Sequence, residues 1–183
     1  MTMWIILGIA VLLLIIFIGM YNGLVKQKNQ LENSFAQIDT QLQRRFDLIP
    51  NLVETVKGYA AHERGTFEAV TAARAATGSA TTIGEKAAAD NQLTNTLKSL
   101  FAVSENYPQL KADANFRELQ VELTNTENKI AFARQFYNDS VKRFNNAIVV
   151  FPQNIVAGML KYTKAEYFET QSPEAREVVK VSF

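Results

Sequence analysis

His62, the single histidine of the chain, is the first residue to consider for chemistry, because imidazole serves both as an acid or base and as a metal ligand. It begins the segment HERGT, which lacks the second histidine that a zinc-protease helix places four residues later. Asp47 and Glu54 could supply carboxylates if folding gathers them beside it. A hydrolase or metal-dependent enzyme with its site inside a helical bundle is therefore one hypothesis, although a surface or capping histidine is the favoured interpretation.

Two further patterns are compatible with ligand binding. Glu118 and Glu122 lie one helical turn apart, so their carboxylates could share a proton or bind a cation, although a solvated helix face is favoured. Phe132, Phe136 and Tyr137 could stack on a ligand, but their spacing fits core packing better. The chain has no phosphate-binding glycine loop, no GxGxxG, no GxSxG and no cysteine. We therefore predict no catalytic residue, no cofactor and no bound metal.

The composition describes one folded domain with a short appendage. The chain has 183 residues, of which 48% are hydrophobic and 20% charged, and its formal net charge is +1. Such a balance argues against the strongly basic surface that nucleic-acid binding usually requires. Nucleic acid is not an expected partner.

An apolar segment from Met3 to Met20 contains no charged side chain and is long enough to span a bilayer, at roughly 27 Å for a rise of ~1.5 Å per residue. A cleaved signal peptide is the alternative, but no lysine or arginine precedes the segment, and GMYNG does not resemble a cleavage site. We predict a transmembrane anchor over residues 1–22 and a bundle over 23–183. The side chains expected in the membrane are those of Trp4, Leu13, Phe17 and Tyr21, with Trp4 and Tyr21 in the headgroup layers.

The positive charges around the span predict its orientation. Lys26, Lys28, Arg44 and Arg45 follow it, whereas only the α-amino group precedes it. Positively charged flanks favour the cytoplasmic side. We therefore expect a single-pass protein of the cell membrane with its C-terminal domain in the cytoplasm.

The apolar positions after the span recur in steps of three and four, from Leu24 to Ile49, as one buried helix stripe requires. No run of Gly, Pro or Ser separates this stripe from the span, so one helix should contain both. Pro50 should kink or end it, with a second helix continuing to about Ala76. Residues 77–85 should then form a flexible connection. Within that connection, Thr82 and Glu85 have the spacing of a capping box.

The second half of the chain continues the helical pattern. A third helix should end before Pro108, and a long fourth helix should run from about Gln109 to Ile148. A short helical turn is expected over 155–160, and a last helix could begin at Ser172. Short connections favour antiparallel packing, so the predicted fold is all-α, with a transmembrane helix continuing into an antiparallel up-down four-helix bundle.

Two features could mediate association of helices. Gly19 and Gly23 form a GxxxG pair at the end of the span, where backbones could approach closely. The helix that follows is rich in amides, which hydrogen-bond without carrying charge, although a solvated face is the favoured alternative. The amides chosen as candidate contacts are Gln27, Gln30, Gln37 and Gln41.

Three segments closely resemble the bacterial LemA family: YNGLV at Tyr21, QIDTQLQRRFDLIPNLVETVKGYAAHE from Gln37, and FRELQVELTNTENKIAFARQFYNDSVKRFN from Phe116. The resemblance extends from the span to the terminal KVSF. It implies an anchored helical bundle in the bacterial inner membrane and supplies no catalytic residues. It also implies one candidate partner, a membrane zinc metalloprotease of the heat-shock type.

The expected function is that of a membrane-anchored scaffold or adaptor. It would self-assemble as a homo-oligomer on the lipid bilayer and bind another membrane-associated protein, with no catalytic activity of its own. A membrane-shaping oligomer and the hydrolase described above are the alternatives.

Overall fold

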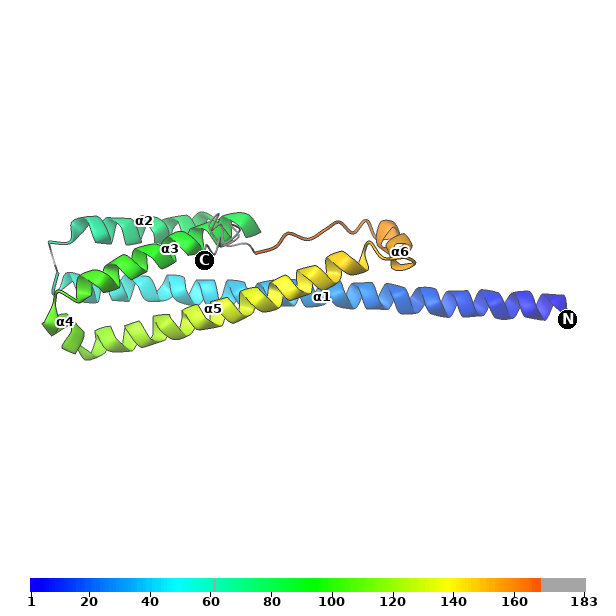
Figure 1. The fold of residues 1–183 in the computed structure, drawn as a ribbon, viewed down its shortest axis with the longest axis horizontal. Helices are drawn as coiled ribbons and strands as arrows, with labels where there is room; N and C mark the ends of the chain where they lie inside the picture. Colours follow the sequence, from blue (N-terminus) through cyan, green and yellow to red (C-terminus); the bar gives the residue numbers. More distant parts are fainter. Residues whose placement is uncertain (61, 169–183) are drawn as a thin grey trace, which may run out of the picture. The chain divides into compact units, whose positions relative to one another are not determined.

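A computed structural model describes residues 1–60 and 62–168. Over these residues it contains six helices and no strand: α1 (Thr2–Lys57), α2 (Arg64–Ser79), α3 (Ile83–Ser104), α4 (Pro108–Ala112), α5 (Ala114–Ala147) and α6 (Gln153–Met159) (Figure 1). The prediction of an all-α chain with a long apolar N-terminal helix is confirmed. The helix expected at Ser172 lies outside the described residues.

The described chain forms two compact units. Unit 1 comprises Met1–Asp39 and Phe132–Tyr167, and unit 2 comprises Thr40–Ala131 with Phe168. Helices α1 and α5 are each divided between the two units. Each unit is described separately below.

Helix α1 continues through Pro50 and ends at Lys57, so the alternative in which a new helix begins at the proline is wrong. A proline inside a helix leaves the carbonyl four residues earlier without its usual donor. Here that carbonyl belongs to Phe46, and the Nε of Arg74 on α2 donates to it at 3.1 Å. The Arg74 guanidinium also stacks over the Phe46 ring, 3.8 Å from its centroid. A tertiary contact thus supplies the hydrogen bond that Pro50 removes.

The connection between α2 and α3 is shorter than the predicted 77–85, because α2 includes Gly78 and ends at Ser79. A Cβ at Gly78 would lie 3.2 Å from the Phe46 ring, so this glycine allows a close approach of α2 to α1. The predicted capping box is confirmed: Thr82 Oγ1 accepts from the N–H of Glu85, and the Glu85 carboxylate accepts from the N–H of Thr82 at 2.9 Å. These hydrogen bonds lower the pKa of Glu85 to about 2.

The predicted fourth helix is divided at Asp113, whose extended backbone separates α4 from α5. Asp113 Oδ1 accepts from the N–H of Phe116 at 2.8 Å, as a capping aspartate does. Its other oxygen accepts from the hydroxyl of Tyr59 at 3.0 Å. The bonds from Phe116 and Tyr59 lower the pKa of Asp113. The start of α5 is thereby tied to the residues that follow α1.

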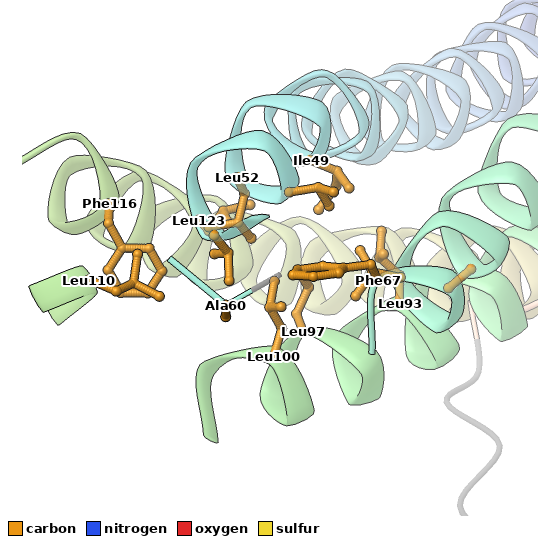
Figure 2. Close-up of a cluster of buried hydrophobic side chains, with 14 residues drawn as sticks. Ile49, Leu52, Ala60, Phe67, Leu93, Leu97, Leu100, Leu110, Phe116 and Leu123 are labelled. Atoms are coloured by element: carbon orange, nitrogen blue, oxygen red, sulfur yellow. The ribbon is translucent and has the colours of Figure 1, made fainter. Parts of the chain in front are cut away.

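Unit 2 has one apolar core to which α1, α2, α3, α4 and α5 all contribute (Figure 2). Helices α2 and α3 pack against each other as a hairpin, and the ring of Phe116 meets that of Phe101 with centroids 6.2 Å apart. The labelled members of the core are Ile49, Leu52, Ala60, Phe67, Leu93, Leu97, Leu100, Leu110, Phe116 and Leu123. The shared core is what a four-helix bundle requires. The up-down order of its helices stays a prediction.

Unit 1 pairs α1 with α5. The rings of Phe35 and Tyr137 lie 5.7 Å apart, and Lys28 lies over the ring of Phe144 at 6.0 Å from its centroid. The extended residues after α6 return along α5, where the Asn145 amide both accepts from and donates to the backbone of Ala165. Tyr137 donates to the carbonyl of Glu166 at 2.8 Å, and burial raises the pKa of this tyrosine to about 12. Side chains of α5 therefore fix the path of the chain beyond α6.

Because Arg74 donates to the Phe46 carbonyl that Pro50 leaves without a helical donor, we predict an energetic coupling between Pro50 and Arg74. Replacing Arg74 with Ala should lower the free energy of unfolding by about 2 kcal/mol, because the carbonyl loses its charged donor. In a Pro50→Ala background the new N–H can donate to that carbonyl, so Arg74→Ala should cost less. Urea unfolding of the four proteins in detergent measures this coupling.

Arg64→Ala is the matched control, since this exposed arginine lies on the same helix. It should change the free energy of unfolding by no more than about 0.5 kcal/mol. An equal cost of Arg74→Ala in both backgrounds would contradict the explanation given for Pro50.

Candidate functional site

The first part of α1 presents apolar side chains that nothing in unit 1 buries. Its most apolar 18-residue window has a mean hydropathy of 3.0, and none of that window is buried. Trp4, Leu13 and Tyr21 are exposed, and Phe17 is half-buried. A core helix of a soluble protein would bury such residues. The exposed helix is long and apolar enough to cross a bilayer, as the membrane-anchor prediction requires.

The candidate association residues differ in accessibility. A Cβ added at Gly19 or Gly23 would meet no other atom within 4 Å among the described residues, so packing within the chain does not require these glycines. Gln30 and Gln37 are exposed. Gln27 and Gln41 are half-buried, and the Oε1 atom of each is buried with no hydrogen-bond partner in the described chain. Gly19, Gly23, Gln30 and Gln37 are therefore open to a second helix, and whether one binds there stays a prediction.

A buried charge lies within unit 2. The Arg45 side chain is 4% exposed, and its Nη1 donates to Asp90 Oδ1 at 2.8 Å and to Thr94 Oγ1 at 2.9 Å. Glu127 Oε2 approaches the same Nη1 at 2.8 Å, as a charge contact without hydrogen-bond alignment. Burial lowers the pKa of Arg45, and the charge of Glu127 partly offsets this effect. A guanidinium remains protonated even so, and the cluster links α1, α3 and α5.

A polar groove of about 610 Å³ lies between α1 and α5 in unit 2. It brings together Glu54, Glu118 and Glu122, and Arg44 forms an ion pair with Glu122. The two glutamates of α5 therefore face a groove that also contains a cation. No group of three His, Asp or Glu side chains placed to hold a metal occurs in the residues that the structure describes.

The residues of the hydrolase hypothesis do not converge on this groove. Of the three, only Glu54 lines it, whereas Asp47 accepts a hydrogen bond from Gln43 at 2.8 Å. His62 is exposed in the turn between α1 and α2. The constellation that this hypothesis needs is therefore not formed.

The aromatic residues of α5 divide between core and surface. Tyr137 is buried, as core packing predicted, but Phe132 is 73% exposed and Phe136 is 39% exposed. Their spacing could not reveal this, because which face of α5 is covered depends on α1 and on the returning segment after α6. Phe132 and Phe136 are thus surface residues of unit 1.

Two features were not identified from the sequence. Arg45 occupies the position at which the seven-residue spacing of Leu24, Leu31, Ile38 and Leu52 places an apolar side chain, and this spacing was the available signal. The second feature is a group of exposed apolar residues after α5, signalled by the run Val149–Val150–Phe151.

A model of the LemA family matches residues 34–183. The magnetosome protein MamQ of Magnetospirillum gryphiswaldense is 27% identical over 192 residues, which covers 88% of this chain and 71% of the relative. MamQ 2 of Paramagnetospirillum magneticum is 28% identical, covering 81% of this chain and 64% of the relative. The protein LemA of Metamycoplasma hominis is 24% identical, covering 89% and 75%. None of these names denotes an enzyme.

The buried arginine predicts a large difference between two neighbouring residues. Arg45→Met should lower the free energy of unfolding by about 3–5 kcal/mol, because it removes the guanidinium that pairs with the fully buried Asp90 carboxylate. Arg44→Met removes an ion pair whose partners are both partly exposed and should cost less than about 1 kcal/mol. Chemical unfolding of both variants measures the difference.

Replacing Asp90 with Leu in the Arg45→Met protein should recover much of the loss, because the buried carboxylate is then removed together with the guanidinium. Similar costs for Arg44→Met and Arg45→Met would show that the buried charges do not matter for stability.

Proposed function

The chain belongs to the LemA family, and from this premise we propose that it is a single-pass membrane protein that serves as a non-catalytic scaffold. The observation that supports this proposal most directly is the exposed apolar part of α1, which continues without interruption into the helix pair of unit 1. Burial of this surface in lipid removes it from water. The helical units would then present their surfaces beside the membrane.

We propose self-assembly through the membrane end of α1. Gly19 and Gly23 lie one turn apart with open space beside them, so the backbone of a second helix could approach closely. Gln30 and Gln37 are exposed on the part of α1 that follows, so their amides could exchange hydrogen bonds with that helix. Both observations support a second copy as the partner.

The proposed client is another membrane-associated protein, with a membrane zinc metalloprotease of the heat-shock type as the candidate. Support for a binding role comes from the exposed Phe132 and Phe136 and from the lack of a convergent acid–base or metal site among the described residues. Exposed aromatic side chains are frequent anchors of protein interfaces.

The assembly proposal predicts an effect of side chains at the glycine pair. Gly19→Leu and Gly23→Leu should each weaken self-association at least about tenfold, or about 1.4 kcal/mol, because they hold the backbones apart. Gly8→Leu, also with open space around it, is the control within the same helix and should not weaken association. Light scattering and crosslinking in a mild detergent give the oligomeric state.

A clean monomer of the unmodified protein, with no co-purifying protein, would count against the scaffold. Equal effects of the three substitutions would show that the glycine pair does not form the contact between the helices.

The orientation proposal places the C-terminal domain in the cytoplasm. The charges that favour this are Lys26 and Lys28, which follow the span directly. Green fluorescent protein fused after Phe183 should therefore fluoresce, and alkaline phosphatase fused there should be inactive. The reverse pair of results would invert the orientation.

A further inference from the structure

The turn after α5 and helix α6 expose an unusual number of apolar side chains. Each is more than half exposed, and they are Val149, Val150, Phe151, Ile155 and Met159. We call residues 149–159 the apolar tip. The opposite face of α6 is packed, because Val156 and Ala157 are buried. The exposed face is therefore displayed by an ordered segment. Exposed apolar groups gathered in this way mark contact surfaces.

The register of α1 and α5 places the tip beside the end of the membrane span. Phe35 meets Tyr137, and Lys28, seven residues earlier, meets Phe144, seven residues later, as antiparallel helices require. Continuing this register brings Ile148 level with Leu24, and both side chains are buried. The next residues of the turn are therefore level with Tyr21 to Gly23, where the apolar part of α1 ends. Figure 1 shows α6 beside this part of α1.

The charges around the tip have one sign. Residues 140–165 contain Lys142, Arg143, Lys161 and Lys164 and no Asp or Glu. All four basic side chains are on exposed residues. Cations beside an apolar face are the combination by which segments bind a surface of anionic lipid. A protein partner would not require this asymmetry, so the charges favour a lipid surface as the occupant.

Lys161 helps to hold the tip in place. Its φ is 54°, a left-handed conformation in which its N–H donates to the Gly158 carbonyl while the N–H of Tyr162 donates to that of Ala157. This pair of bonds ends α6 and turns the chain back. The Tyr162 ring then packs on Phe144, with centroids 5.5 Å apart. The tip is thereby anchored to the same part of α5 that contacts Lys28.

We infer that the apolar tip is a second membrane contact, inserted among the lipid headgroups beside the end of the α1 span. The inference rests on the proposed function, since it takes α1 as the membrane anchor. Val149, Phe151 and Ile155 would enter the interface, while Lys161 and Lys164 would meet anionic phosphates. The protein would then be held to the bilayer at two places on one face.

The absence of cysteine permits a direct test in the full chain. Single cysteines are introduced by Ile9→Cys, Phe151→Cys and Phe132→Cys, and each is labelled with an environment-sensitive fluorophore. The proteins are reconstituted in vesicles of phosphatidylethanolamine and phosphatidylglycerol, with or without doxyl-labelled lipid as quencher. Phe132 is the matched control, because it is 73% exposed where Phe151 is 74% exposed. It lies 15 residues before the end of α5, or roughly 22 Å at ~1.5 Å per residue.

The expected result is loss of emission with doxyl lipid at positions 9 and 151 but not at 132. Quenching at position 9 without quenching at position 151 would overturn the second membrane contact and leave the membrane anchor in place. The same result is expected if the tip binds another protein instead of lipid. Quenching at neither would overturn the membrane anchor and this inference with it. Equal quenching at 151 and 132 would show adsorption of the whole helix pair, which also contradicts a specific tip.

Discussion

A guanidinium inside a protein must have its charge compensated by nearby acidic groups. Because Arg45 is buried in unit 2, this requirement constrains how the helices around it are aligned. Apolar side chains such as Leu42 and Ile49 can exchange one neighbour for another at modest cost. Arg45 cannot, because its Nη1 needs Asp90 on α3 and Glu127 on α5 at 2.8 Å each. Sliding α1 by one turn would separate the guanidinium from the buried Asp90 carboxylate. A polar residue in an otherwise apolar helix seam commonly selects one register in this way. We therefore regard the cluster as the feature that aligns three helices, while the apolar core supplies most of the cohesion.

In the same unit, a neighbouring helix replaces a hydrogen bond that is missing from α1. Pro50 deprives the Phe46 carbonyl of its helical donor, and Arg74 replaces that donor from a neighbouring helix. The Phe46 ring lies close both to the Arg74 guanidinium and to the backbone at Gly78. A proline that would be costly in an isolated helix is thus tolerated because α2 lies against it. Helix α1 and helix α2 depend on each other at this point, although neither local sequence reveals it.

These contacts explain which parts of the structure the sequence predicts and which it does not. Features encoded within a few residues were predictable: the exposed apolar span, the capping box of Thr82 and Glu85, and the stop before Pro108. The errors concern residues whose conformation depends on distant partners. Pro50 lies inside α1 where Arg74 replaces the missing hydrogen bond, Gly78 lies inside α2 close to Phe46, and Asp113 divides a helical pattern while accepting from Tyr59. For the candidate site, the open glycines could be named in advance, and the seven-residue spacing signalled a buried position at Arg45, but the partners of Arg45 and the exposure of Phe132 could not be named. Both depend on which helix faces are covered by segments far away in the chain.

The unbroken course of α1 through Gly23 has a mechanical consequence. A membrane helix that is longer than the hydrocarbon layer can adapt to a thinner bilayer by tilting. Helix α1 has no hinge between its apolar part and Leu24, where α5 begins to cover it, so any tilt of the span turns the attached helix pair through the same angle. Lipid composition would then affect the orientation of unit 1. A change in the thickness of the hydrocarbon layer would change the angle between unit 1 and the membrane.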